Sequence, residues 1–149
     1  MKKLTLLAAT FALAALAAPA HATKEDAQGL LKAALAEIKA KGLDAASASI
    51  TAGGPWAKGT TYVFVADTQT VKILGHAVNN KLIGKSLIDV KDANGKPFVQ
   101  EQLALVKKDG SGAVTMRWMN PVTKQLGDAE ALVSRVPGAD AYVGAVYFK

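Results

Sequence analysis

The sequence predicts an α+β fold, in which a five-stranded antiparallel sheet is covered by a long N-terminal helix and by a helix inserted between the second and third strands. Three observations predict it. Apolar residues recur at helical spacing in residues 24–41, and the period changes to that of β-strands after Gly59. A second helical stretch, at 98–108, then interrupts the strand pattern.

The first helix has a defined start and stop in the sequence. Thr23 and Asp26 have the spacing of a capping box, and Gly42 follows the last turn. One buried stripe is expected along this helix, formed by Ala27, Leu31, Ala34, Leu35 and Ile38. A shorter helical piece is expected at 43–50, and the segment Ala52-Gly53-Gly54-Pro55 breaks it.

Five strands are predicted after Gly59. They cover residues 61–66, 71–74, 113–119, 131–136 and 141–148. Residues 75–84 are expected to form an irregular loop with His76 near its start, and Pro97 begins the inserted helix. On a period of two, Tyr62 shares a face with Phe64, and the valines on either side of Phe64 point to the opposite face, toward the other helix.

A secretory signal peptide is predicted for residues 1–22. A short cationic start precedes an apolar run at 4–18, and Ala20-His21-Ala22 fits a small-x-small cleavage site. The run is shorter than the roughly 20 residues that span a bilayer as a helix, which favours cleavage after Ala22 over an uncleaved membrane anchor. We therefore expect a soluble periplasmic protein with a single domain, residues 23–149.

The composition argues against catalysis, metals and nucleic acids. The chain has no cysteine, and His76 is the only histidine of the predicted mature chain, so a zinc site lacks ligands and a Ser-His-Asp triad lacks a nucleophile elbow. No P-loop or dinucleotide fingerprint occurs. Once Lys2 and Lys3 are removed, 16 of the 18 Lys and Arg remain against 12 Asp and Glu, and they are scattered. We therefore expect no enzyme, no cofactor and no nucleic-acid partner.

The segment 90–101 partly matches a calcium-binding EF-hand loop. Asp92, Asn94, Gly95 and Glu101 fall at positions 3, 5, 6 and 12 of such a loop. Position 1 is Val90, however, which has no carboxylate, and the helical pattern after Pro97 would break the loop. A turn followed by a helix start is favoured, and no metal site is predicted.

Seven short motifs follow one another along the predicted mature chain. They are YVFVAD at 62–67, LGH at 74–76, IGKSL at 83–87, DANGKPF at 92–98, GSG at 110–112, WMNP at 118–121 and YVGAVY at 142–147. In order and spacing the chain resembles the single Cache domain, type 2. The resemblance implies a PAS-like antiparallel sheet, a long N-terminal helix packed across it, and a small-ligand pocket between the sheet and its covering loops.

The resemblance also implies a sensory function. Cache domains are usually the extracytoplasmic sensors of chemoreceptors and histidine kinases, and the type 2 domains often bind short organic acids. We therefore expect a Cache protein that binds a small organic anion, a short carboxylate, in signalling. No signalling module follows the last strand before Lys149, so a free-standing form is expected, with a membrane sensor kinase or chemoreceptor as its partner.

Three positions depart from the pattern of that family. A glycine usual in the first turn is replaced around Thr70-Val71, a proline common after the histidine is Ala77, and a Lys-x-x-Tyr motif is replaced by Ala129 to Leu132. These departures leave a second hypothesis open. The chain would then be a protein-interaction module of the same fold with a vestigial pocket, acting as an accessory to a membrane sensor.

Six residues are candidates for the ligand site, namely Tyr62, Phe64, His76, Lys85, Arg117 and Trp118. A guanidinium can grip a carboxylate through two parallel hydrogen bonds, and Tyr62 offers an aromatic wall with a hydroxyl. His76 can donate to a carboxylate or cap backbone carbonyls, and Lys85 either closes the pocket or is solvated. Because Arg117 and Trp118 face opposite sides of their strand, we expect only Arg117 to reach the ligand, with Trp118 in the core.

Overall fold

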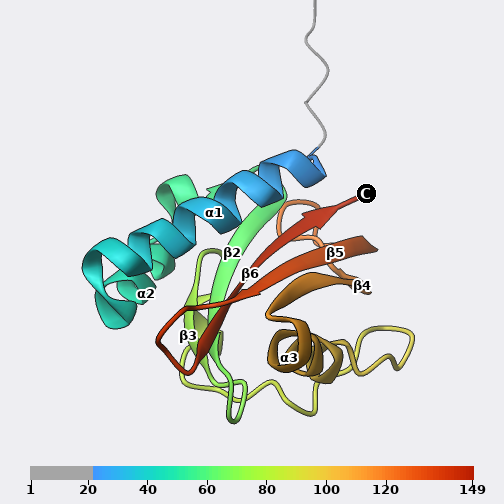
Figure 1. Cartoon of the computed structure of the whole chain (residues 1–149). Coiled ribbons are helices and arrows are strands. Elements are labelled where there is room, and N and C mark those ends of the chain that lie inside the picture. Colours follow the sequence, from blue (N-terminus) through green and yellow to red (C-terminus); the bar gives the residue numbers. More distant parts are fainter. Residues whose placement is uncertain (1–21) are drawn as a thin grey trace, which may run out of the picture.

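The computed structural model describes residues 22–149 (Figure 1). The predicted signal peptide therefore lies outside the described residues, apart from Ala22. The helices are α1 (Lys24–Lys41), α2 (Leu43–Thr51) and α3 (Phe98–Asp109), with short 3-10 turns η1 (Gly54–Trp56) and η2 (Asn80–Leu82). Within this part of the chain, no helix combines the length and the apolar character needed to cross a membrane.

The strands form one antiparallel sheet, which confirms the predicted α+β fold. They are β1 (Ala57–Lys58), β2 (Thr61–Asp67), β3 (Ile73–His76), β4 (Ser111–Met119), β5 (Leu126–Arg135) and β6 (Ala141–Phe148). Their order is β1-β2-β6-β5-β4, with β3 pairing on β2, and α3 is inserted between β3 and β4. The sixth strand, not predicted, is the two-residue β1 at one edge of the sheet.

The predicted positions of two strands were wrong. β3 begins at Ile73 and ends at His76, so His76 lies in a strand, where it pairs with Phe64, and not in a loop. β5 begins at Leu126 rather than at residue 131, and its first residues, 126–128, are exposed or only partly buried where they pair with the end of β4. A strand that is exposed on one side carries too few apolar residues to be recognised from its pattern.

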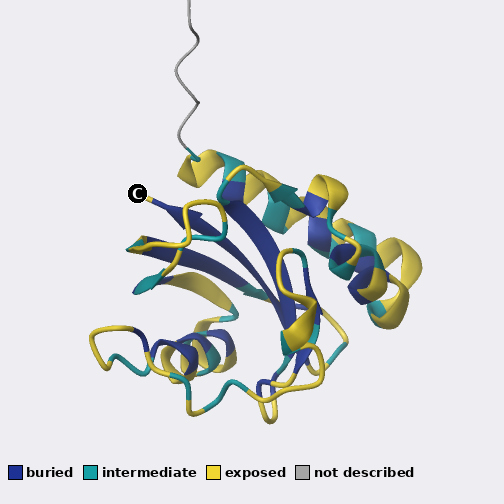
Figure 2. Ribbon diagram, turned by 180° about the vertical axis from the view of Figure 1, so that it is seen from behind, coloured by how far each residue is buried: buried dark blue, intermediate teal, exposed yellow. Residues whose placement is uncertain are grey.

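The two faces of the sheet bury two separate cores. α1 and α2 cover one face, and α3 with the long connection from β3 covers the other (Figure 1). Figure 2 shows buried residues along the central strands and on the sheet-facing sides of the helices. Val63 and Val65 pack with α1, whereas Tyr62 and Phe64 lie in the opposite core, as their alternation predicted.

The start of α1 is also as predicted. The Thr23 hydroxyl accepts a hydrogen bond from the Asp26 N–H, and the Asp26 carboxylate accepts one from the Thr23 N–H, both at 3.1 Å. These two bonds satisfy N–H groups that have no partner within the helix. Gly42, at φ 87°, then turns the chain from α1 directly into α2. The result is a helical layer that leaves the α3 face of the sheet free to form a cavity.

Candidate functional site

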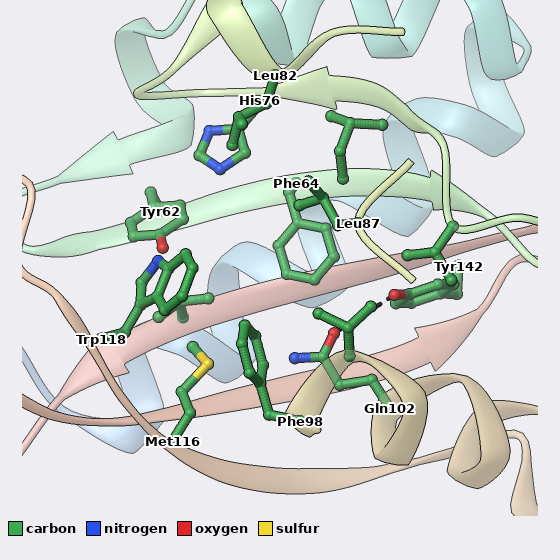
Figure 3. Close-up of a pocket in the computed structure, with 14 residues that line it drawn as sticks. Tyr62, Phe64, His76, Leu82, Leu87, Phe98, Gln102, Met116, Trp118 and Tyr142 are labelled. Atoms are coloured by element: carbon green, nitrogen blue, oxygen red, sulfur yellow. Dashed lines mark hydrogen bonds between the residues drawn. The ribbon is translucent and has the colours of Figure 1, made fainter. Parts of the chain in front are cut away.

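A cavity of about 50 Å³ lies between the sheet and α3 (Figure 3). We call it the inner cavity. Fourteen side chains line it, from four strands, from α3, from the turn between β2 and β3 and from the connection after β3: Tyr62, Phe64, Val71, Ile73, His76, Leu82, Leu87, Phe98, Val99, Gln102, Met116, Trp118, Tyr142 and Val146. Because about 10–15 Å³ of such space holds one water, it admits a molecule or a tail of only a few non-hydrogen atoms.

Aromatic rings make the walls of the inner cavity rigid. Phe64 meets Tyr142 edge-on, with ring centroids 5.9 Å apart, and Phe98 packs against Trp118 at 5.0 Å. Phe64 can lie flat across β6 only because residue 144 is glycine, since a Cβ at Gly144 would collide with the Phe64 ring. The cavity is therefore shaped by interlocked rings whose positions leave little freedom.

His76 is a neutral hydrogen-bond donor at the rim of the inner cavity. Its Nδ1 accepts the backbone N–H groups of Val78 at 3.3 Å and Asn79 at 3.1 Å. A nitrogen that accepts cannot carry the proton, so the proton is on Nε2. Burial lowers the pKa of His76 to about 4, which keeps the ring uncharged near neutral pH. Within residues 22–149, the hydrogen bonds of the ring are both made by Nδ1, which leaves Nε2–H for a ligand.

Tyr62 supplies a second neutral donor beside His76. Their ring centroids are 5.1 Å apart, and the Tyr62 hydroxyl points toward the indole nitrogen of Trp118 (Figure 3). Burial raises the pKa of Tyr62 far above its ordinary value, and the interaction with Trp118 offsets only part of that rise. An indole N–H can only donate, so the Tyr62 oxygen accepts and its own proton is free for a ligand.

The opposite, deep end of the inner cavity carries a polar pair that the sequence did not single out as a site. The Tyr142 hydroxyl donates to Gln102 Oε1 over 3.4 Å, a long hydrogen bond between β6 and α3. Gln102 is polar, yet it is only 2% exposed, because it lies on the buried stripe of α3 with Phe98 and Val106. A polar residue on a buried helical stripe was the signal available in the sequence.

The inner cavity adjoins a larger space, which we call the outer cleft. The outer cleft has a volume of about 480 Å³ and shares Tyr62, His76, Leu82 and Trp118 with the inner cavity. It adds two lysines, Lys81 from η2 and Lys124 from the β4–β5 hairpin. Among residues 22–149, no Asp, Glu, Lys or Arg side chain lines the inner cavity itself, so the positive charge of the site is at its mouth.

The structure brings four of the six predicted site residues together and leaves two outside. Tyr62, Phe64, His76 and Trp118 line the inner cavity. Lys85 is exposed and lines neither space, and it contributes only backbone hydrogen bonds, such as the one from the Ile73 N–H at 2.9 Å.

Arg117 does not lie where it was expected. It stands on the face of β4 opposite Trp118, and its Nη1 pairs with Asp128 Oδ1 at 3.0 Å near the surface. The alternation along β4 was read correctly. The choice of face was wrong, because the cavity lies on the side of Met116 and Trp118. Trp118, expected in the core, therefore has the place in the site that was assigned to Arg117.

Asp92, from the segment that partly matches an EF-hand loop, caps backbone groups. Its carboxylate accepts the N–H groups of Asn94, Lys96 and Arg117, each at 2.9 Å. The bond from Arg117 is the largest of the effects that hold the pKa of Asp92 below its ordinary value. Within residues 22–149 no three His, Asp or Glu side chains are grouped to hold a metal ion.

A comparison with known protein families identifies the family of this chain. Residues 6–148 match the family described as Single Cache domain 2. The chain belongs to this family. The matched range begins inside the predicted signal peptide and ends one residue before Lys149. Domains of this Cache family are extracytoplasmic sensory modules, and the fold and cavity described above have the arrangement that the resemblance implied.

Solved structures of sensor domains share the fold. A periplasmic sensor domain of a chemotaxis protein is 25% identical, with a TM-score of 0.63 over 83% of this chain and 88% of the other. A methyl-accepting chemotaxis protein from Vibrio parahaemolyticus RIMD 2210633 is 21% identical, with a TM-score of 0.69 over 84% and 87%. A Cache chemosensory domain described for its recognition of carboxylic acids is 23% identical, with a TM-score of 0.64 over 83% and 86%. No curated protein is similar enough in sequence to be matched.

Proposed function

We propose that this Cache domain binds a short carboxylic acid, without transforming it, and reports its presence to a membrane sensor kinase or chemoreceptor. One observation carries the proposal. The free donors of Tyr62 and His76 converge where the apolar inner cavity meets the lysine-bearing outer cleft. A carboxylate needs several hydrogen-bond donors and a nearby positive charge, and its hydrocarbon part needs an apolar space. The solved Cache domain that recognises carboxylic acids supports the same ligand class.

A thermal-shift series on the mature chain, residues 23–149, tests this proposal. Acetate, propionate, butyrate, pyruvate and lactate would be titrated, and a binder should raise the unfolding midpoint as RT ln(1 + [L]/Kd), about 2.7 kcal/mol of stability at 100 times Kd. Tyr62→Phe removes the hydroxyl and should weaken the response. Arg117→Gln, outside both spaces, is the matched control and should leave the response unchanged. If none of the acids moves the midpoint, the proposal fails.

We also propose export to the periplasm, with the signal peptide removed after Ala22. The capping box at Thr23 supports this position, because α1 would begin directly at the new N-terminus. The intact mass of protein recovered from the periplasm should correspond to residues 23–149. Recovery of the uncleaved chain from the membrane fraction would instead support an N-terminal anchor.

One observation favours the second candidate, a protein-interaction module with a vestigial pocket. The β4–β5 hairpin exposes Met119 (48%), Val122 (61%) and Leu126 (49%), and two charged lysines stand near them at the mouth of the site. Large apolar side chains gathered on a surface are typical of contact sites. For this candidate, Val122→Asp should abolish co-purification with the membrane sensor while no acid changes the unfolding midpoint.

A further inference from the structure

The two ends of the proposed ligand site differ in charge. At the deep end, Tyr142 pairs across the sheet with Ala66, the neighbour of Asp67, and the negative charge of Asp67 adds to the effect of burial in raising the pKa of Tyr142 above its ordinary value. At the mouth, the outer cleft is lined by Lys81 and Lys124. An anion entering the site would therefore meet attraction at the mouth and repulsion at the deep end.

The negative charge of Asp67 is held in place by the turn after β2. Its carboxylate accepts the backbone N–H groups of Gln69 at 2.8 Å, Thr70 at 2.7 Å and Lys72 at 2.8 Å. Burial alone would raise the pKa of Asp67, but these hydrogen bonds outweigh burial and lower it. The Asp67 carboxylate is therefore charged at neutral pH, and its hydrogen bonds to the backbone fix its position.

The positive end is built by two different elements. Lys81 lies in η2, where the Asn79 side chain accepts the Lys81 N–H at 3.2 Å. Lys124 has a positive φ of 59°, and its N–H donates to the Asn120 carbonyl at 2.9 Å. A lysine rarely adopts this backbone conformation, so the hairpin holds Lys124 at a defined place beside the cleft. Backbone hydrogen bonds thus fix the positions of both lysines in the chain.

We infer that the acid binds tail-first, with its hydrocarbon tail in the inner cavity and its single carboxylate at the mouth. The tail would contact Phe64, Phe98 and Met116. The carboxylate would accept from Tyr62 and His76 and face the two lysines of the outer cleft. The ligand class is a monocarboxylate with an unbranched tail of a few carbons, since the inner cavity measures about 50 Å³. This inference rests on the proposed function and adds the orientation and the exclusion of diacids.

Diacids are excluded because their second carboxylate would occupy the deep end. That end offers a hydroxyl and an amide but no cation from residues 22–149, and Asp67 follows Ala66, the cross-strand partner of Tyr142. An ion moved from water into such a space loses its hydration without gaining a counter-charge. A methyl group loses nothing by the same transfer.

Three ligands of matched length test the orientation by calorimetry on the mature chain. Butyrate, succinate and butyramide share a four-carbon chain and differ in the charge at each end. Butyrate should bind, and succinate should bind at least about tenfold more weakly, which corresponds to about 1.4 kcal/mol. Lys81→Gln combined with Lys124→Gln should weaken butyrate about tenfold, remove most of its salt dependence, and leave butyramide unchanged. Lys85→Gln, an exposed lysine outside the site, is the control.

Gln102→Leu separates the two possible orientations. If the tail lies at the deep end, this variant should keep butyrate binding within about threefold, since no charge meets Gln102. Equal binding of succinate and butyrate would overturn the inference, as would loss of butyrate binding in Gln102→Leu with full binding in the double lysine variant. Those results would leave the proposed function standing with the carboxylate at the deep end. Failure of every monocarboxylate to bind would overturn the proposed function and the orientation together.

Discussion

His76 makes folding stability depend on pH, because its Nδ1 already accepts two backbone N–H groups and has no place for a second proton. Burial lowers its pKa to about 4, against an ordinary value of 6.5. Between these values the unfolded chain binds a proton that the folded chain does not. The free energy of unfolding therefore has its full value well above pH 6.5. It decreases as the pH falls toward 4, by at most about 3 kcal/mol.

Urea unfolding at pH 7, 5.5 and 4.5 measures this dependence. His76→Gln should be less stable at pH 7 but should show a flatter profile between pH 7 and 4.5. The carboxyls of Asp26, Glu37, Asp67, Asp92 and Glu130 also have lowered pKa values, and the stability that they contribute is lost mainly below about pH 4.5, at the lower edge of this window. Parallel profiles for the two proteins would show that His76 is not the titrating group.

Val71 combines a strained backbone with a place in the inner cavity. Its φ is 54°, a conformation that β-branched residues rarely adopt, yet its side chain is 1% exposed. Val71→Gly should relieve about 1–2 kcal/mol of backbone strain, which offsets much of the roughly 1.5–3 kcal/mol lost with the buried side chain. Val71→Ala keeps the strain and should be the less stable variant, the reverse of the usual order of alanine and glycine.

Thermal unfolding of the two Val71 variants measures that order. Val71→Gly should also enlarge the inner cavity and favour acids with tails one or two carbons longer. If Val71→Ala proves more stable than Val71→Gly, the positive φ does not strain the folded chain.

Among the elements, β4 is an edge strand whose outer backbone groups are met by a turn. Arg117 N–H donates to the Asp92 carboxylate, Ala93 N–H donates to the Arg117 carbonyl at 3.3 Å, and Lys96 Nζ donates to the Thr115 carbonyl at 2.6 Å. Unpaired edge groups invite pairing with another chain, so the turn also protects the sheet from association. Asp92 therefore stabilises the outer edge of β4, the strand that carries Met116 and Trp118.

Asp92→Ala should loosen this cap, because three backbone N–H groups lose one shared acceptor. We expect a lower midpoint of thermal unfolding, faster amide exchange at Asn94, Lys96 and Arg117, and more association at high protein concentration. Asp92→Asn keeps one acceptor oxygen and should be intermediate. Unchanged exchange at Arg117 in the alanine variant would contradict the role of the cap.

Local pattern predicted the elements and their faces, whereas long-range packing decided which face carries the site. The alternation of Tyr62, Val63 and Phe64 and the capping box at Thr23 each depend on neighbours in sequence, and both are confirmed. Whether Trp118 or Arg117 meets the cavity depends on where α1 and α3 pack, which local periodicity does not encode. The side of the sheet on which α3 packs was the missing information.

The same distinction explains the residues that were missed. Lys81 and Lys124 are separated by more than forty positions and meet only because η2 and the β4–β5 hairpin lie at one mouth. His76 was assigned to a loop because Gly75, next to it, weakens a strand pattern. Gly75 is needed there, since a Cβ would collide with the Ser47 carbonyl of α2, a contact between distant parts of the chain.

At the scale of the whole molecule, Glu130 joins the two ends of the fold. The start of α1 and the end of β6 lie close together (Figure 1). The Glu130 carboxylate pairs with Lys149 Nζ at 3.0 Å and with Lys24 Nζ at 3.6 Å. Burial alone would raise the pKa of Glu130, but Lys149 and Lys24 outweigh it and lower that pKa. One side chain of β5 thereby holds the first turn of α1 and the last residue of the chain on the same side of the sheet.

Glu130→Gln should free both ends while leaving the cavity intact, because the carboxylate lies on the α1 face and the cavity on the α3 face. We expect a loss of about 1 kcal/mol or less, since both lysines are half exposed and such pairs are weak. Amide exchange should quicken in the first turn of α1 and at Lys149, whose N–H donates to the Asp128 carbonyl at 2.9 Å. At 1 M salt the difference from the parent chain should largely disappear. Butyrate affinity should stay within about twofold, and a larger loss would mean that the ends and the cavity are coupled through β2 and β6, the central strands that both faces share.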